Sequence, residues 1–188
     1  MKTKYILFLG DSLTYGYLVA SNRSFPSIIE NKLREKKLID KNVHIINAGN
    51  PGDTTEMALF RLKYYLSNYK NIFIAVVYLG ANDYLTGESI NQVHNNLTEI
   101  IQQLKNYNKN IKIILISFTP FDPSLEKEYQ KMYEQIKNQY PEIVIAPDVL
   151  QEILRDPSLV MSDGIHPNEK GYEIIANKIL PYIEGLLK

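Results

Sequence analysis

The sequence predicts an α/β fold, a three-layer α/β/α sandwich built on a parallel sheet. Short apolar runs alternate along the chain with longer segments of helical period. The runs are rich in Ile, Val and aromatic residues and show little polar alternation, which is typical of strands covered on both faces. With 188 residues, 45% of them hydrophobic, the chain can bury a sizeable core, and we expect one domain over residues 1–188.

Five apolar runs are predicted as strands. They cover residues 4–9, 43–46, 72–79, 111–117 and 142–146. Right-handed crossovers between consecutive parallel strands place helices on both faces of such a sheet. We choose the flavodoxin-like strand order 2-1-3-4-5, in which ligands bind beyond the carboxyl ends of the strands. The segments that follow the strands are therefore the first place to look for a site.

Five segments with apolar residues at helical spacing are predicted as helices. They cover residues 24–38, 55–69, 89–107, 123–140 and 168–187. Polar residues precede these segments, and two of them are followed by Glu or Gln three residues later, which is typical of helix caps. The predicted caps are Asp53, Ser89, Asp122 and Asn168.

Charge and composition exclude several classes of function. Lys plus Arg and Asp plus Glu number 21 each and form no long run of one sign, so we expect no nucleic-acid partner. Cysteine is absent, which excludes disulfides, thiol nucleophiles and thiolate metal ligands. The histidines lack the spacing of metal ligands, so we expect no metal site.

No segment of the sequence predicts insertion into a membrane. No apolar stretch approaches the roughly 18 residues that a membrane-spanning helix needs. The apolar run that follows Lys4 is too short for the core of a secretory signal. We therefore expect a cytoplasmic chain, except where a leader was removed ahead of residue 1.

Polar, glycine-rich segments follow the strands and precede the last helix, and a parallel sheet brings them to one rim. They are residues 10–12, 47–53, 80–83 and 163–167. Among them are a hydroxyl at Ser12, an imidazole at His166 and a carboxylate at Asp163. A serine hydroxyl becomes nucleophilic when a neutral imidazole takes its proton, and a carboxylate fixes the imidazole tautomer. We therefore predict Ser12, Asp163 and His166 as a catalytic triad for acyl transfer.

Acyl transfer also needs donors for the oxygen that becomes negatively charged in the tetrahedral intermediate. The backbone N–H of Ser12, the backbone N–H of Gly52 and the side-chain amide of Asn82 are available at the same rim. Glycine allows a close approach of the backbone, and an amide donates without a charge that must be desolvated. The predicted oxyanion hole therefore consists of Ser12, Gly52 and Asn82.

The four polar segments resemble the sequence blocks of the GDSL, or SGNH, hydrolases, in order and with suitable spacing. The similarity extends over essentially the whole chain and is greatest to bacterial arylesterases, thioesterase I and lysophospholipase L1. It implies a cofactor-independent serine hydrolase that cleaves small carboxylic esters or thioesters through an acyl-enzyme. The matching residues are Gly10-Asp11-Ser12-Leu13, Gly52 within NAGNPGDTT, Gly80-Ala81-Asn82-Asp83 and Asp163-Gly164-Ile165-His166-Pro167.

Two positions depart from the family pattern. Ala81 stands where many relatives have a second glycine, and the bulky Tyr84 follows the Asn-Asp pair. Because this loop helps to shape the acyl pocket in relatives, we expect Tyr84 to affect acyl-chain preference. The segments after the third and fourth strands are expected to line that pocket, with candidate walls at Tyr84, Phe118 and Phe121.

Other interpretations of these residues stay open at this stage. A helix cap is the alternative for Asp11 and Ser12, and we expect Asp11 and Asp83 to support the backbone. A flavodoxin-like binding module, with residues 10–16 around a phosphate, is the alternative from another class, but it leaves the Asp-His pair unexplained. Alcohol, thiol, lysophospholipid and acetylated-sugar substrates all present the same carbonyl, so the motifs do not rank these leaving groups.

Overall fold

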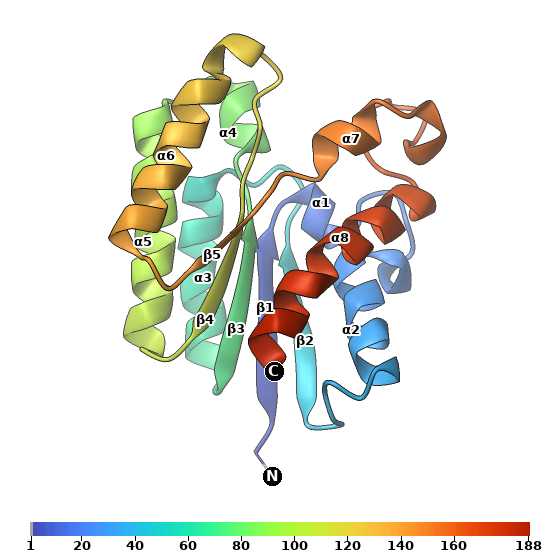
Figure 1. Ribbon diagram of the computed structural model, residues 1–188, viewed down its shortest axis with the longest axis vertical. Helices are drawn as coiled ribbons and strands as arrows, with labels where there is room; N and C mark the ends of the chain where they lie inside the picture. Colours follow the sequence, from blue (N-terminus) through green and yellow to red (C-terminus); the bar gives the residue numbers. More distant parts are fainter. Residues whose placement is uncertain (1) are drawn as a thin grey trace.

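The structure is a computed structural model that describes residues 2–188, and its sheet confirms the predicted topology (Figure 1). Five parallel strands pair in the order β2-β1-β3-β4-β5. The chain therefore has an α/β fold with the flavodoxin-like strand order. The strands are β1 (Lys4–Gly10), β2 (Val43–Gly49), β3 (Ile72–Tyr78), β4 (Lys112–Ile116) and β5 (Val144–Ala146).

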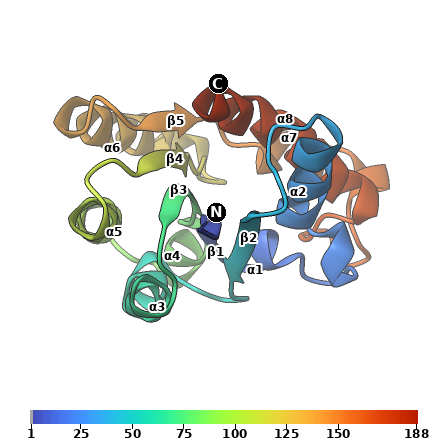
Figure 2. The ribbon, with the colours of Figure 1, turned by 90° about the horizontal axis from the view of Figure 1, so that it is seen from below.

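Long helices cover both faces of this sheet (Figure 2). One face packs against α3 (Thr55–Asn68), α5 (Ile90–Tyr107) and α6 (Glu126–Gln139). The other face packs against α2 (Phe25–Glu35) and α8 (Glu169–Leu187). Within residues 2–188, none of the helices combines the length and the apolar composition required to cross a bilayer.

Alternate side chains of the strands belong to different cores. In β1, Leu7 and Leu9 pack into the cluster that includes α3 and α5, whereas Ile6 and Phe8 pack into the cluster that includes α2 and α8. All four side chains are fully buried, and burial of each contributes about 1.5 to 3 kcal/mol. Burial on both faces is the reason why the strand sequences lack polar alternation.

Several short elements are absent from the sequence prediction because they are too short to show an apolar period. Two of them, α1 and α4, directly follow β1 and β3 and so lie at the carboxyl ends of the strands. The predicted helix over residues 123–140 is divided into a 3₁₀ turn and α6. The short helices are α1 (Ser12–Tyr15), α4 (Ala81–Thr86) and α7 (Leu150–Leu154), and the 3₁₀ turns are η1 (Ser21–Arg23), η2 (Pro123–Leu125) and η3 (Pro157–Leu159).

One predicted cap is wrong and three are confirmed. The hydroxyl of Thr54, and not the carboxylate of Asp53, accepts a hydrogen bond from the first turn of α3. Asp53 instead forms an ion pair with Arg61, at 2.6 Å between Oδ2 and Nε, which turns its carboxylate away from the helix end. The confirmed caps, each of which accepts a backbone N–H of the element that follows, are Ser89, Asp122 and Asn168.

Candidate active site

Ser12 lies just beyond the carboxyl end of β1, where α1 begins. Asp11 caps this short helix by accepting a hydrogen bond from the N–H of Leu13 at 2.9 Å. Gly10 ends the strand, and a Cβ atom there would meet Oγ1 of Thr14 at 2.0 Å. The tight turn therefore requires glycine before the acid, and it presents Ser12 at the rim of the sheet.

The rim brings the predicted triad within hydrogen-bonding distance. Nε2 of His166 is 3.1 Å from Oγ of Ser12, and Nδ1 of His166 is 2.6 Å from Oδ2 of Asp163. Because a carboxylate only accepts hydrogen bonds, Nδ1 carries the proton in this pair. Nε2 of the neutral ring is then free to accept a hydrogen bond from the serine hydroxyl. Residues that are 154 positions apart in the sequence thus meet at one point.

The loop before α8 holds Asp163 and His166 in this relation. Oδ1 of Asp163 accepts the backbone N–H groups of Ile165 at 2.9 Å and of His166 at 3.0 Å. Hydrogen bonds to this carboxylate lower the pKa of Asp163 to about 2, and the largest effect comes from the backbone N–H of His166, followed by the His166 ring and the N–H of Ile165. The carboxylate therefore stays ionised at neutral pH. No third His, Asp or Glu joins the pair in the described part of the chain, so it lacks the ligand set of a metal site.

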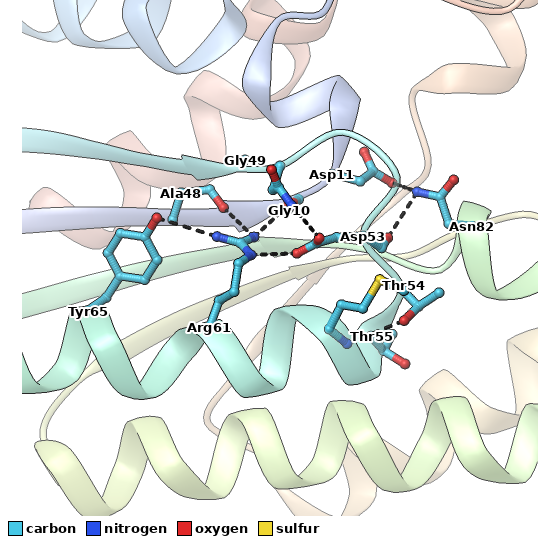
Figure 3. Close-up of polar contacts among 12 residues, drawn as sticks. Gly10, Asp11, Ala48, Gly49, Asp53, Thr54, Thr55, Arg61, Tyr65 and Asn82 are labelled. Carbon is cyan, nitrogen blue, oxygen red and sulfur yellow. Dashed lines mark hydrogen bonds and ion pairs between the residues drawn. The ribbon is translucent and has the colours of Figure 1, made fainter.

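Asp53, which directly follows Gly52, and Asn82 meet beside Asp11, the residue before Ser12 (Figure 3). Nδ2 of Asn82 donates to the carbonyl oxygen of Asp53 at 2.9 Å and lies 3.5 Å from Oδ2 of Asp11. Gly52 directly precedes Asp53 and has a φ of 86°, a conformation that favours glycine. In residues 2–188, the backbone N–H groups of Ser12 and Gly52 find no acceptor within the chain.

Comparison with known proteins decides the family. The sequence model of the GDSL-like Lipase/Acylhydrolase family matches residues 8–174. The chain belongs to this family. An arylesterase of Vibrio mimicus is 30% identical to this chain over 174 residues, which are 91% of this chain and 84% of that protein.

Two further relatives cover almost the whole chain. The thioesterase 1/protease 1/lysophospholipase L1 of Escherichia coli strain K12 is 26% identical over 183 residues, which are 97% of this chain and 84% of that protein. The crystal structure of the psychrotrophic esterase EstA from Pseudoalteromonas sp. has a TM-score of 0.86 at 24% identity and covers 98% of both chains. The resemblance found in the sequence motifs is confirmed, and the GDSL hydrolase is a serine ester hydrolase.

Asp83 of the GDSL hydrolase holds the segment that carries Asn82. It is fully buried, and its carboxylate accepts the N–H of Thr55 at 2.9 Å and the hydroxyl of Thr55 at 2.6 Å. Nδ2 of Asn96 donates to the same hydroxyl at 3.0 Å. These bonds tie α4 to the first turn of α3 and to α5, so Asp83 has the supporting role expected from the sequence.

The three predicted pocket residues form one aromatic cluster next to the site. The ring centroids of Tyr84 lie 5.9 Å from Phe118 and 5.6 Å from Phe121, and those of the two phenylalanines are 6.0 Å apart. Phe118 is only 2% exposed, whereas Phe121 is 40% exposed. The exposed surface of this cluster therefore comes from Tyr84 and Phe121, while Phe118 belongs to the core.

Asp11 is a buried carboxyl group with an unusual proton affinity. Its side chain is almost completely enclosed, and this desolvation, together with the negative charges of Asp53 and Asp83, raises its pKa from 3.8 to about 7. The N–H of Leu13 opposes the shift by donating to the carboxylate. Near neutral pH, Asp11 therefore exchanges its proton directly beside the amide of Asn82.

We expect the stability of the GDSL hydrolase to fall between pH 5 and 8 because of Asp11. An unfolded carboxyl loses its proton near pH 3.8, whereas the folded one keeps it up to about 7, so the folded state binds more protons in this window. The free energy of unfolding then decreases by about 2 to 3 kcal/mol as pH rises from 5 to 7. Urea unfolding at several pH values measures this slope.

Asp11→Asn should remove that slope, because asparagine keeps an acceptor for the helix cap and does not titrate. Asp156→Asn is the matched control. Asp156 also caps a short element, but it is exposed and its pKa is lowered by the side chain and N–H of Ser158, so it stays ionised above pH 5. If Asp11→Asn showed the same pH dependence of the free energy of unfolding as the wild type, Asp11 would not be its cause.

The sequence analysis missed two residues that contact the site. The ring of Tyr17 lies 4.7 Å from the ring of His166, between centroids, and covers one side of the imidazole. Arg61 binds Asp53, which follows Gly52. The available signal for Arg61 was a single cation within the apolar stretch MALFRL of a predicted helix, eight residues after an acid.

Proposed function

We propose that the GDSL hydrolase cleaves carboxylic esters or thioesters through an acyl-enzyme formed on Ser12. The observation that carries this proposal is the line of hydrogen bonds from Oγ of Ser12 through the ring of His166 to Asp163, at 3.1 and 2.6 Å. A binding module without catalysis does not need such a line. Ester and thioester substrates are supported by the names of the relatives, arylesterase and thioesterase.

The first half-reaction transfers the acyl group to the protein. Oγ of Ser12 attacks the carbonyl carbon while Nε2 of His166 takes the hydroxyl proton. The carboxylate of Asp163 stabilises the imidazolium through Nδ1. When the tetrahedral intermediate collapses, the bond to the leaving group breaks and the leaving group receives the proton from Nε2. A water molecule activated by the same nitrogen then releases the carboxylic acid and restores Ser12.

The negative charge of the tetrahedral intermediate is assigned to three donors, the N–H groups of Ser12 and Gly52 and the amide of Asn82. One hydrogen of the Asn82 amide bonds to the carbonyl of Asp53 at 2.9 Å, and the other has only the long contact of 3.5 Å to Asp11. The first bond fixes the orientation of the amide, while the second N–H is weakly bonded and free to bind an oxyanion.

A fluorophosphonate probe and a substrate panel test this function. The panel contains p-nitrophenyl esters of increasing acyl length, acyl-CoA thioesters, a lysophospholipid and acetylated sugars. We expect hydrolysis of p-nitrophenyl esters, and we expect one probe molecule bound per chain to abolish it. A chain that neither reacts with the probe nor hydrolyses any member of the panel would contradict the proposal. The relative kcat/KM values then rank the leaving groups.

Tyr84→Ala should shift acyl-chain preference toward longer chains. Its ring and that of Phe121 form the exposed part of the aromatic cluster, so its removal opens space beside the site. The ratio of kcat/KM for decanoate to that for butyrate should rise by about tenfold or more, since each methylene in an apolar pocket contributes about 1 to 3 kcal/mol. Tyr64→Ala, at an exposed position of α3, is the control. Equal chain-length profiles for both variants would refute a pocket role for Tyr84.

A further inference from the structure

Arg61 in α3 binds three parts of the rim at once (Figure 3). Its Nε donates to Oδ2 of Asp53 at 2.6 Å. Its Nη2 donates to the carbonyl oxygen of Ala48 at 2.9 Å and to that of Gly10 at 3.4 Å. The guanidinium therefore links the end of β1 and the end of β2 to the loop that contains Gly52.

Asp53 connects Arg61 to two of the assigned oxyanion donors, the N–H of Gly52 and the amide of Asn82. The residue is 3% exposed, and its second carboxylate oxygen accepts the side-chain amide of Asn50 at 2.6 Å. Because both oxygens are held, the backbone of Asp53 has a fixed direction. Its carbonyl oxygen is the acceptor that orients the amide of Asn82, and its N-terminal neighbour is Gly52.

We propose that Arg61 is a positioning residue for the oxyanion hole, acting through Asp53 on the N–H of Gly52 and the amide of Asn82. The inference rests on the proposed function, because it assumes that these groups bind the oxyanion. Gly52 has no side chain to pack, and the peptide that joins it to Asp53 is held by the hydrogen bond from the N–H of Asp53 to the carbonyl oxygen of Asn50 at 3.1 Å, so the position of Gly52 depends on its neighbour Asp53. Arginine suits the position because its planar fork bonds to several acceptors at once.

A second arginine shows what an equivalent side chain does away from the site. Arg34 in α2 donates to the carboxylate of Glu30 at 2.5 Å and to the carbonyl oxygens of Val43 at 2.7 Å and Asp40 at 2.9 Å. It therefore has the same kinds of partner as Arg61, and the two side chains are similarly exposed, at 33% and 24%. Arg34, however, joins the helix to the start of β2, at the amino ends of the strands, whereas Ser12 lies beyond their carboxyl ends.

The test compares Arg61→Met with Arg34→Met on p-nitrophenyl butyrate, at a temperature where both variants are folded by circular dichroism. We expect Arg61→Met to lower kcat by roughly tenfold with KM within twofold of wild type, since a displacement of about 1 Å in a site costs up to about 10²-fold. Arg34→Met should keep the wild-type kcat. Arg61→Lys, which retains the charge but not the fork, should fall between wild type and Arg61→Met.

A double variant tests the route through Asp53. In an Asp53→Ala background, Arg61→Met should lower kcat by less than it does alone, because both changes remove the same bond. A wild-type kcat for Arg61→Met, or equal loss for Arg61→Met and Arg34→Met, would overturn the inference while leaving the proposed function intact. If Arg61→Met does not fold, a wild-type kcat for Arg61→Lys would overturn it equally. A wild-type protein that hydrolyses no ester would instead refute the proposed function itself.

Discussion

Ser12→Ala is expected to lower kcat for ester hydrolysis by about 10⁴-fold or more, because the members of a triad act as one unit. The variant lacks the oxygen that lies 3.1 Å from Nε2 of His166, so no acyl-enzyme forms. Residual hydrolysis would come from the attack of water on an ester whose carbonyl oxygen is bound in the oxyanion hole. Steady-state kinetics with p-nitrophenyl butyrate give kcat and KM, and the fluorophosphonate probe should no longer label the protein.

The control for Ser12→Ala is Ser67→Ala, which changes an exposed serine of α3 outside the rim. This variant should keep wild-type kinetics and probe labelling. Retention of a tenth or more of wild-type kcat by Ser12→Ala would rule out Ser12 as the nucleophile, provided that circular dichroism shows the variant folded. Loss of activity in both variants would indicate a defect of folding rather than of chemistry.

Asn82→Ala is expected to lower kcat by about 10² to 10³, or about 2.7 to 4 kcal/mol, the effect of removing one oxyanion donor. The interaction strengthens as the carbonyl oxygen gains charge, so KM should change little. Because the amide also binds the carbonyl of Asp53, the variant frees that carbonyl as well. Initial rates across a range of substrate concentrations separate kcat from KM.

Asn68→Ala separates the catalytic effect of the Asn82 amide from its structural effect. The side-chain amide of Asn68 likewise donates to a backbone carbonyl, that of Tyr64 at 2.8 Å, but it lies at the far end of α3. Asn68→Ala should therefore leave kcat unchanged. A loss confined to KM in Asn82→Ala would assign Asn82 to ground-state binding and contradict the oxyanion assignment.

The strands, and the meeting of the residues of the candidate site, were predictable because they depend on local pattern. A strand buried on both faces must be apolar at every position, and Ile6 to Leu9 satisfy this condition in one short run. Ser12, Gly52, Asn82 and His166 lie in short polar blocks directly after or between such runs, and the parallel topology brings those blocks together.

The cap of α3 and the burial of Phe118 were not predictable from the sequence, because they depend on which side chains contact each other in the folded protein. Asp53 and Thr54 both precede α3, and either can cap it. Thr54 takes the cap because Arg61, two turns into the helix, binds the carboxylate of Asp53 and draws it toward the strand ends. The burial of Phe118 is likewise a tertiary effect, because its N–H donates to the hydroxyl oxygen of Tyr133 at 2.8 Å, a contact that only the folded core provides.

The meeting of Ser12 and His166 across 154 positions has a consequence for when the protein becomes reactive. The first βα unit alone carries an alcohol without a base, and the loop before the last helix alone carries a base without an alcohol. Under the proposed mechanism, neither half of a growing or cleaved polypeptide can therefore attack an acyl group. The complete site then arises only when α8 docks against α2, β4 and β5, so turnover would report the completion of folding.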